Sequence, residues 1–458
     1  MQVERLKNAL TDFMGEDAPE PSEEDIKIMF AILRYGGLPV DGVHGVTYLN
    51  ETYVRWYYRL VQLESTLCTD APRYNSLRKA DGQAYNLFRY TGTEDLAQDI
   101  DVFRRAIGQN KLSIYGLSYG TVVGSNYATL FPNHTDRLVL DGVIPPVLET
   151  HTLPTHQQKG YSNVFEAVFT DCFESLYRNA SEEERCPLAP SPSSKVQHMI
   201  NDRTNLTRAA AVANYFDNIA CGNDNACIDG APATVACAAA LYSKGAQTPE
   251  YCNVSAVSEA KPENAPLGPG TENDRFYETQ KTIMSAVIGL DAPGRYGEEA
   301  LIALWQDQLR AYGMSVRHYI EWMVPCSTWP MYSKPLPPAG NERIPALVIG
   351  NLHDQATDFG GAQLMRQAFP SGSLMTYQGF GHCLAARSFE VVGATGSEVN
   401  SVQSINHCKH LIDKYLETLE LPFDGHACHL YSPLSLGPAA VERYLQSHAN
   451  DSINRRGR

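Results

Sequence analysis

The sequence has no long hydrophobic run and no excess of positive charge. No stretch is apolar enough to cross a bilayer, and residues 1–25 are polar and acidic, without the apolar core of a signal peptide. The formal net charge of −15 argues against a nucleic-acid partner, because such a partner requires a basic face. An acidic protein is compatible with a cationic substrate, such as the free amino end of a peptide, and equally with acidity that serves solubility alone.

Metal-binding patterns are also missing. None of the eleven cysteines lies in a C-x-x-C pair, and the spacing of Cys221, Cys227, Cys237 and Cys252 does not match a zinc site. Disulfides are the better interpretation, and we expect neither a metal nor another cofactor.

Six N-x-S/T sequons agree with a secretory or vacuolar compartment, although about half of them are expected by chance. The sequons begin at Asn50, Asn133, Asn179, Asn205, Asn253 and Asn450. The odd cysteine count and the missing signal peptide would share one explanation if the chain began downstream of its natural start.

What the chain does have is a hydrophobic content of 43% over 458 residues, which is enough for a large core with an insertion. Residues 93–142 alternate between helix and strand, as in a parallel-sheet unit. We expect Thr93 to cap a helix that Gly108 ends, strands over 111–115 and 137–140, and a helix from Tyr119. The first helix would bury one apolar stripe, made of Leu96, Ile100, Phe103 and Ile107.

The strongest local signal is the pentapeptide Gly116-Leu117-Ser118-Tyr119-Gly120, which lies between an expected strand and an expected helix. This context is that of a nucleophile elbow, a tight turn that presents a serine on strained backbone. We therefore assign Ser118 as the nucleophile. The backbone N–H of Tyr119 would supply one donor to an oxyanion.

A serine nucleophile needs a histidine base and a carboxylate to orient it, and the chain offers both after later strands. Asp354 follows the expected strand 344–350, and His382 ends a Gly-Phe-Gly-His loop after the strand 373–377. We assign Asp354 as the acid and His382 as the base. The competing acids are Asp358 and Asp141, and the competing bases are His353, His407 and His410.

These motifs resemble the tripeptidyl-aminopeptidase-like serine peptidases, relatives of the proline iminopeptidases. The resemblance covers about 68–150 and 320–430. It rests on YGLSYGT, YATLFP and DRLVLDGVIPP, and then on CSTWP at 326–330, IPALVIGNLHDQATD at 344–358 and GFGHC at 379–383. It implies an α/β-hydrolase fold with a helical cap, secretion, and release of short peptides or single residues from free N-termini. It also implies Ser118, Asp354 and His382 as the catalytic residues.

Two features of that family are not visible in this sequence. Relatives carry a glycine-rich oxyanion loop and a D-x-R-G-x-G-x-S segment before the nucleophile, and residues 36–39 are only a faint echo of the first. The second oxyanion donor is therefore unassigned. A chain without the first strands would also leave one edge of its sheet exposed.

The expected organisation has five parts. An N-terminal helical segment over 1–67 is followed by the first part of the core over 68–145 and a helical cap over 146–325, with long helices near 278–290 and 299–323. The second part of the core covers 326–434, and a tail covers 435–458. The pattern over residues 2–14 predicts a helix. Residues 22–34 are compatible either with a helix or, over 29–33, with a strand.

Several assignments stay open at this stage. We expect a disulfide between Cys408 and Cys428, whereas Cys383 is either bridged or the odd thiol. The oligomeric state, the substrate-binding residues and the residue preference are not determined. Two alternative functions remain, an esterase or lipase with the same catalytic residues, and a truncated hydrolase fold without catalysis. The acidic cap residues expected to pair with a substrate ammonium are Glu166, Asp171 and Glu174.

Overall fold

The computed structural model describes residues 40–41, 45–177, 181–182, 185–219, 235, 237–242, 283–292, 294–332, 335–384 and 397–429. The expected helix over 2–14, the two readings of 22–34 and the glycine-containing segment 36–39 lie outside these residues. Among the described residues, no helix has the length and apolar character that a membrane span requires.

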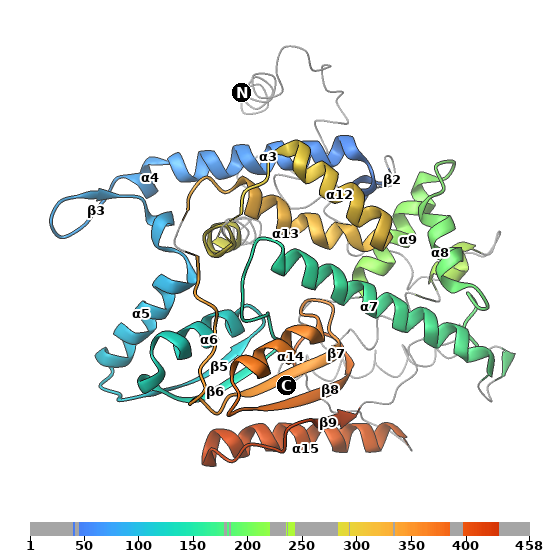
Figure 1. The fold of residues 1–458 in the computed structure, drawn as a ribbon. Helices are drawn as coiled ribbons and strands as arrows, with labels where there is room; N and C mark the ends of the chain where they lie inside the picture. Colours follow the sequence, from blue (N-terminus) through green and yellow to red (C-terminus); the bar gives the residue numbers. More distant parts are fainter. Residues whose placement is uncertain are drawn as a thin grey trace, which may run out of the picture.

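Within the part of the chain that the structure describes, a five-stranded sheet forms the core (Figure 1). Its strands follow one another in the order β5-β6-β7-β8-β9, and all neighbouring pairs are parallel. The carboxyl ends of all five strands therefore meet at one edge, where loops collect. The bounds are β5 Leu112–Leu117, β6 Thr135–Asp141, β7 Leu347–His353, β8 Ser373–Phe380 and β9 His426–His429.

Helices cover both faces of this sheet because its side chains alternate between two apolar layers. Val139, Ile349 and Met375 pack on one face against α15 (Ser397–Thr418), which lies below the sheet in Figure 1. The alternate residues, among them Leu140 and Val348, pack on the other face. The helices there are α6 (Gly120–Leu130) and α14 (Phe359–Ala368). This arrangement confirms the expected α/β class.

The helix α5 (Thr93–Ala106) corrects two expectations. Gly92 occupies its N-cap position, so Thr93 is the first helical residue and not the cap. The face that α5 buries includes Ala97, Asp101 and Arg104, whereas Phe103 of the expected apolar stripe is 58% exposed. Among the described residues β5 is the last strand on this side of the sheet, so no further strand covers the stripe.

A helical layer lies over the carboxyl edge of the sheet and is inserted between β6 and β7 (Figure 1). Its members pack around one core with α3, including the buried side chains of Tyr57, Val168, Trp305 and Tyr319. The N-terminal α3 therefore shares a core with the cap, while the five expected boundaries remain predictions. The bounds are α3 Glu51–Asp70, α7 Thr152–Glu174, α8 Pro192–Ile200, α9 Leu206–Ile219, α12 Glu298–Tyr312 and α13 Val316–Thr328.

The helix expected over 299–323 is two helices. Gly313 ends α12 with a φ of 56°, a left-handed conformation that favours glycine, and α13 follows in a new direction. The expected helix near 278–290 is described over 283–291. The smaller elements are β1 Val40–Asp41, β2 Gly45–Val46, α4 Pro72–Asn75, β3 Leu77–Arg78 and β4 Ala84–Tyr85, with single 3-10 turns at Thr47–Leu49, Leu87–Tyr90, Pro132–His134, Ser175–Tyr177 and Gly313–Ser315.

Candidate active site

Ser118 lies on the tight turn between β5 and α6. Its φ of 55° is left-handed, which is unusual for a residue with a side chain and marks a strained turn. The turn closes because position 116 is a glycine: a Cβ there would lie 2.3 Å from the carbonyl oxygen of Gly120. The Ser118 N–H donates to the carbonyl oxygen of Asp141 at 3.0 Å, which ties the turn to the end of β6.

Asp354 and His382 form a hydrogen-bonded pair after the ends of β7 and β8. His382 Nδ1 lies 3.0 Å from each carboxylate oxygen of Asp354, whose side chain is buried. A carboxylate accepts, so Nδ1 carries the proton and Nε2 is the basic nitrogen of the neutral ring. Thr357 fixes the orientation of the Asp354 carboxylate. Its hydroxyl donates to one carboxylate oxygen at 2.8 Å, and its backbone N–H donates to the other at 2.9 Å.

The competing carboxylates have other partners. Asp358 caps α14 by accepting the Gly360 N–H at 3.1 Å, and it also accepts the side-chain amide of Asn163 at 2.9 Å. The carboxylate of Asp141 accepts the backbone N–H of Leu384 at 2.9 Å from each oxygen. The carboxylate that contacts the His382 imidazole is therefore that of Asp354.

The competing histidines are placed differently from His382. His353 is the last residue of β7, and burial lowers its pKa. His407 and His410 are exposed on α15, which packs on the sheet face opposite α6 and α14.

Two strand registers and one loop hydrogen bond bring Ser118 and the Asp354–His382 pair to one edge of the sheet. Leu117 pairs with Asp141, and Asp141 pairs with Ile349. The His382 loop reaches the same edge, because the Gly381 N–H donates to the carbonyl oxygen of His353 at 3.0 Å. A Cβ on Gly142 would lie 3.0 Å from Cε1 of His382, so the imidazole lies directly against the turn after β6.

Tyr119, the expected oxyanion donor, is held by a residue of the cap. Its hydroxyl donates to the buried carboxylate of Asp291 at 2.6 Å, and the Thr93 N–H donates to the same carboxylate at 2.8 Å. Burial, followed by the neighbouring Asp291, raises the pKa of Tyr119 well above its ordinary value. Burial also raises the pKa of Asp291. The phenol therefore stays protonated at neutral pH and keeps Tyr119 attached to α5 and the cap.

A pocket of about 250 Å³ adjoins this group. Asp291 lines it, and so do Glu94 and Asp95 from the first turn of α5 and the guanidinium of Arg89. With three acidic side chains against one basic side chain, the pocket suits a cationic group.

The cap helix α7 lies close to Asp354. A Cβ on Gly160 would lie 2.4 Å from the carbonyl oxygen of Asp354, so glycine permits this close approach. Of the acidic residues expected to meet a substrate, Glu166 and Glu174 are exposed on α7, whereas Asp171 is half-buried.

Two supporting residues, Thr357 and Asp291, were not predicted from the sequence. Thr357 follows Asp354 by three residues, a spacing at which a carboxylate commonly accepts backbone and hydroxyl hydrogens, so this signal was present. Asp291 contacts Thr93 and Tyr119 across 198 and 172 residues, and no local pattern marks such a contact.

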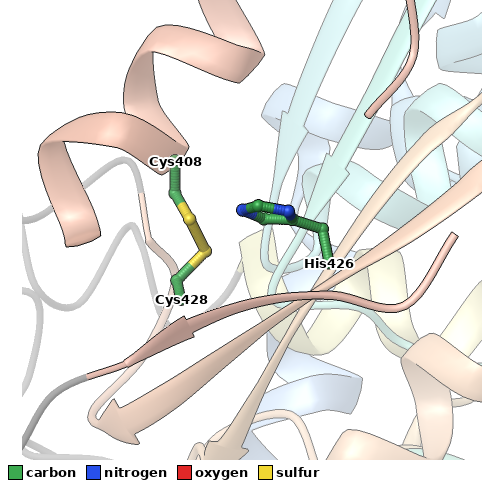
Figure 2. A group of neighbouring side chains, drawn as sticks. All are labelled: Cys408, His426 and Cys428. Carbon is green, nitrogen blue, oxygen red and sulfur yellow. A yellow bond between two sulfur atoms is a disulfide. The ribbon is translucent and has the colours of Figure 1, made fainter. Parts of the chain in front are cut away.

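Outside this constellation, two disulfides join cysteines within the described residues. Cys408 of α15 is bonded to Cys428 of β9, and Cys172 of α7 to Cys186. The imidazole of His426 lies beside the first of these bonds (Figure 2), and the three side chains approach closely enough to hold a metal ion. Metal ligation requires thiolates, whereas these sulfurs are bonded to each other. The group is therefore a structural crosslink, as drawn in Figure 2.

Two segments of the chain match known protein families. A family model described as TAP-like protein matches residues 313–428, and one described as alpha/beta hydrolase fold matches residues 66–184. The serine protease Hip1 of Mycobacterium tuberculosis is 34% identical over 120 residues, which are 26% of this chain and 22% of Hip1. The tripeptidyl aminopeptidase of Streptomyces lividans is 50% identical over 54 residues, 12% of this chain and 10% of that protein.

The aligned segments thus span less than a quarter of the length of either relative. A solved structure, that of esterase E22, aligns with 73% of this chain and 71% of its own at 16% identity and a TM-score of 0.26, which is too weak to support an argument. The parallel sheet, the strained serine turn and the two family matches agree with one another. The chain has an α/β-hydrolase fold, and its residues 313–428 are similar to the TAP-like proteins.

Proposed function

We propose that the chain is a serine hydrolase that releases short peptides or single residues from free N-termini. The observation that carries the proposal is the Asp354–His382 pair at the sheet edge that also carries Ser118 on its strained turn. The names of two relatives, a serine protease and a tripeptidyl aminopeptidase, support a peptide substrate.

The proposed chemistry is acyl transfer. Nε2 of His382 takes the proton of the Ser118 hydroxyl while the serine oxygen attacks the substrate carbonyl. The imidazolium then gives this proton to the departing amine, and an acyl-enzyme remains. Water attacks the ester while His382 takes a proton from it, the imidazolium returns this proton to the Ser118 oxygen as the acyl bond to that oxygen breaks, and the acid product leaves. Asp354 stays ionised and stabilises the imidazolium.

Tyr119 is the proposed oxyanion donor. Its backbone N–H follows the nucleophile at the start of α6, whose N-terminus carries partial positive charge. Removing one such donor costs on the order of 10²–10³ in rate in serine hydrolases.

The nucleophile is tested with a fluorophosphonate probe on folded protein. We expect wild type to be labelled at Ser118 and the Ser118→Ala variant to remain unlabelled. Ser113→Ala is the matched control, since Ser113 is an exposed serine on the same strand, and it should label like wild type. No labelling of a wild-type protein that melts cooperatively would overturn the proposal and favour a hydrolase fold without catalysis.

The exopeptidase mode is tested by hydrolysis of a tripeptidyl amide with a free amino end and of the same peptide acetylated at its N-terminus. We expect cleavage of the first to be at least about 10-fold more efficient, the discrimination available to one buried charge contact. Equal rates would contradict N-terminal recognition. Faster turnover of a matched acyl ester than of either peptide would indicate an esterase.

Two acidic sets compete for the substrate's ammonium. The pocket beside Asp291 contributes Glu94 and Asp95, and α7 contributes Glu166 and Glu174. Paired Glu→Gln and Asp→Asn changes in one set should raise the KM for the free-amine peptide and leave that for the acetylated peptide unchanged. If neither pair of changes alters the ratio of the KM for the acetylated peptide to the KM for the free-amine peptide, these residues do not bind the ammonium.

For the compartment, we propose secretion or residence in a vacuole or lysosome. The disulfides Cys172–Cys186 and Cys408–Cys428 support it, because disulfides persist in oxidising compartments. Mass spectrometry of the protein from its natural source, before and after glycosidase treatment, tests this through the sequons at Asn50, Asn133 and Asn205, which are exposed.

A further inference from the structure

Asp141, the last residue of β6, contacts both segments that carry the proposed catalytic residues. Its carbonyl oxygen accepts the Ser118 N–H at 3.0 Å and the Cys383 thiol at 3.4 Å. Its carboxylate accepts the Leu384 N–H at 2.9 Å from each oxygen. Asp141 is fully buried. One residue thus connects the turn of Ser118 to the two residues that directly follow His382.

Both connected segments have backbone conformations that need external support. Ser118 and Cys383 have φ values of 55° and 59°, in the left-handed region that residues with side chains rarely adopt. Such conformations persist where surrounding contacts fix them. The hydrogen bonds to Asp141 are contacts of this kind on each side of the site.

The residue after Asp141 places the imidazole as well. Gly142 has a φ of 68°, and its N–H donates to the carbonyl oxygen of Ile349 at 3.2 Å, which fixes the turn to β7. A Cβ at this position would lie 2.5 Å from the Cys383 sulfur and 3.0 Å from Cε1 of His382. The His382 loop therefore packs directly on the Asp141–Gly142 turn.

The contacts of Asp141 differ from those of a catalytic acid. Its carboxylate accepts a backbone N–H, whereas the Asp354 carboxylate accepts from the imidazole itself. A buried carboxylate that accepts N–H groups holds a loop in place, because releasing the loop would leave a buried charge without its donor.

We propose that Asp141 is a positioning residue that sets the distance between the His382 imidazole and the Ser118 hydroxyl by attaching the His382 loop to the Ser118 turn. The consequence for rate rests on the proposed function, whereas the attachment of the loop does not. The backbone carbonyl of Asp141 remains in any variant, so substitutions test the carboxylate half of the connection.

The attachment is tested by hydrogen exchange of the segment 380–384 in the full chain. Asp141→Ala should raise the exchange rate of the Leu384 amide at least about 10-fold, because the buried acceptor of its N–H is gone. Asp141→Asn keeps an oxygen acceptor and should have a smaller effect. The Asp141→Asn variant also provides the test if the Asp141→Ala variant does not fold. Unchanged exchange at Leu384 in every folded Asp141 variant would overturn the proposal, whether or not the protein is an enzyme.

The consequence is tested by the rate of fluorophosphonate labelling and by kcat and KM. Asp141→Ala should lower the labelling rate and kcat by about 10²-fold with little change in KM, since small displacements of catalytic groups cost this much. Asp101→Asn is the matched control, because Asp101 is a buried carboxylate on α5 with partners outside the site. It should lower the melting temperature without lowering the labelling rate of the folded protein.

These results separate the two proposals. If wild type is not labelled but the Leu384 exchange responds to Asp141→Ala, the proposed function fails and the attachment stands. If wild type is labelled and the folded Asp141 variants are labelled at the wild-type rate, the positioning role fails while the proposed function stands.

Discussion

The hydroxyl of Tyr119 donates a 2.6 Å hydrogen bond to the carboxylate of Asp291, a residue 172 positions further along the chain. Tyr119 directly follows the proposed nucleophile, whereas Asp291 belongs to the helical segment 283–291 between β6 and β7. The same carboxylate also receives the N–H and the hydroxyl of Thr93 at the start of α5. The cap and the nucleophile turn are therefore connected through one buried acidic side chain.

Asp291→Asn should weaken this connection, because the neutral amide offers one acceptor oxygen where the carboxylate offers two. We expect a loss of about 1–3 kcal/mol in the free energy of unfolding, measured with urea, together with a lower kcat. Tyr119→Phe is the narrower companion, since it removes only the phenolic hydroxyl and should have a smaller effect on stability. If both variants match wild type in stability and kcat, Asp291 does not support the turn.

Asp354→Asn should lower kcat by about 10⁴-fold, because an amide favours the wrong imidazole tautomer and cannot stabilise the imidazolium. Asp358→Asn is the matched control four residues away, at the N-cap of α14. Asparagine is also a good N-cap, so kcat should change little there, whereas stability should fall because one amide oxygen replaces the two that accept from Gly360 and Asn163. Steady-state kinetics on one substrate compare the two, and equal effects on kcat would contradict the assignment of Asp354.

We expect Asp101 to contribute to the loss of folding stability at acid pH. The Arg104 guanidinium and then His134 hold the pKa of Asp101 down at about 2. A lowered folded-state pKa gives stability above the unfolded value near 4 that is lost as the pH falls toward 2. In the Asp101→Asn variant, the melting temperature should therefore fall less between pH 4 and pH 2 than it does in wild type. Asp99→Asn, at an exposed position of α5, should retain the wild-type slope.

Removing the bond between Cys408 and Cys428 should destabilise the protein. The bond joins α15 to β9 across 20 residues, and a loop of this size corresponds to about 3 kcal/mol of unfolding free energy in the chain-entropy description. We expect the Cys408→Ala/Cys428→Ala protein to unfold at lower urea concentration, and a reductant to shift wild type in the same direction. A double variant as stable as wild type would show that the packing of α15 suffices without the bond.

Much of the sheet was predictable because its signals are local. Buried apolar runs marked β6 and β7, and the glycine pattern around Ser118 marked the strand-to-helix turn. The predictions that were wrong concern features that depend on residues far away in the sequence. The apolar stripe of α5 predicted burial, but its exposure depends on whether a strand lies beyond β5.

The sequence by itself determined the class of fold, the approximate positions of β5, β6, β7 and β8, and the placement of Ser118, Asp354 and His382 after strand ends, whereas it gave no sign of β9. It could do so because strand propensity, glycine turns and strand-end polar residues are properties of short segments. Only the tertiary structure decided which carboxylate contacts His382. In the fold, Asp358 caps a helix and Asp141 accepts a backbone N–H. Several acids satisfy the same local pattern, and strand register and loop packing select among them. That selection is a matter of distances across the fold, which no short segment encodes.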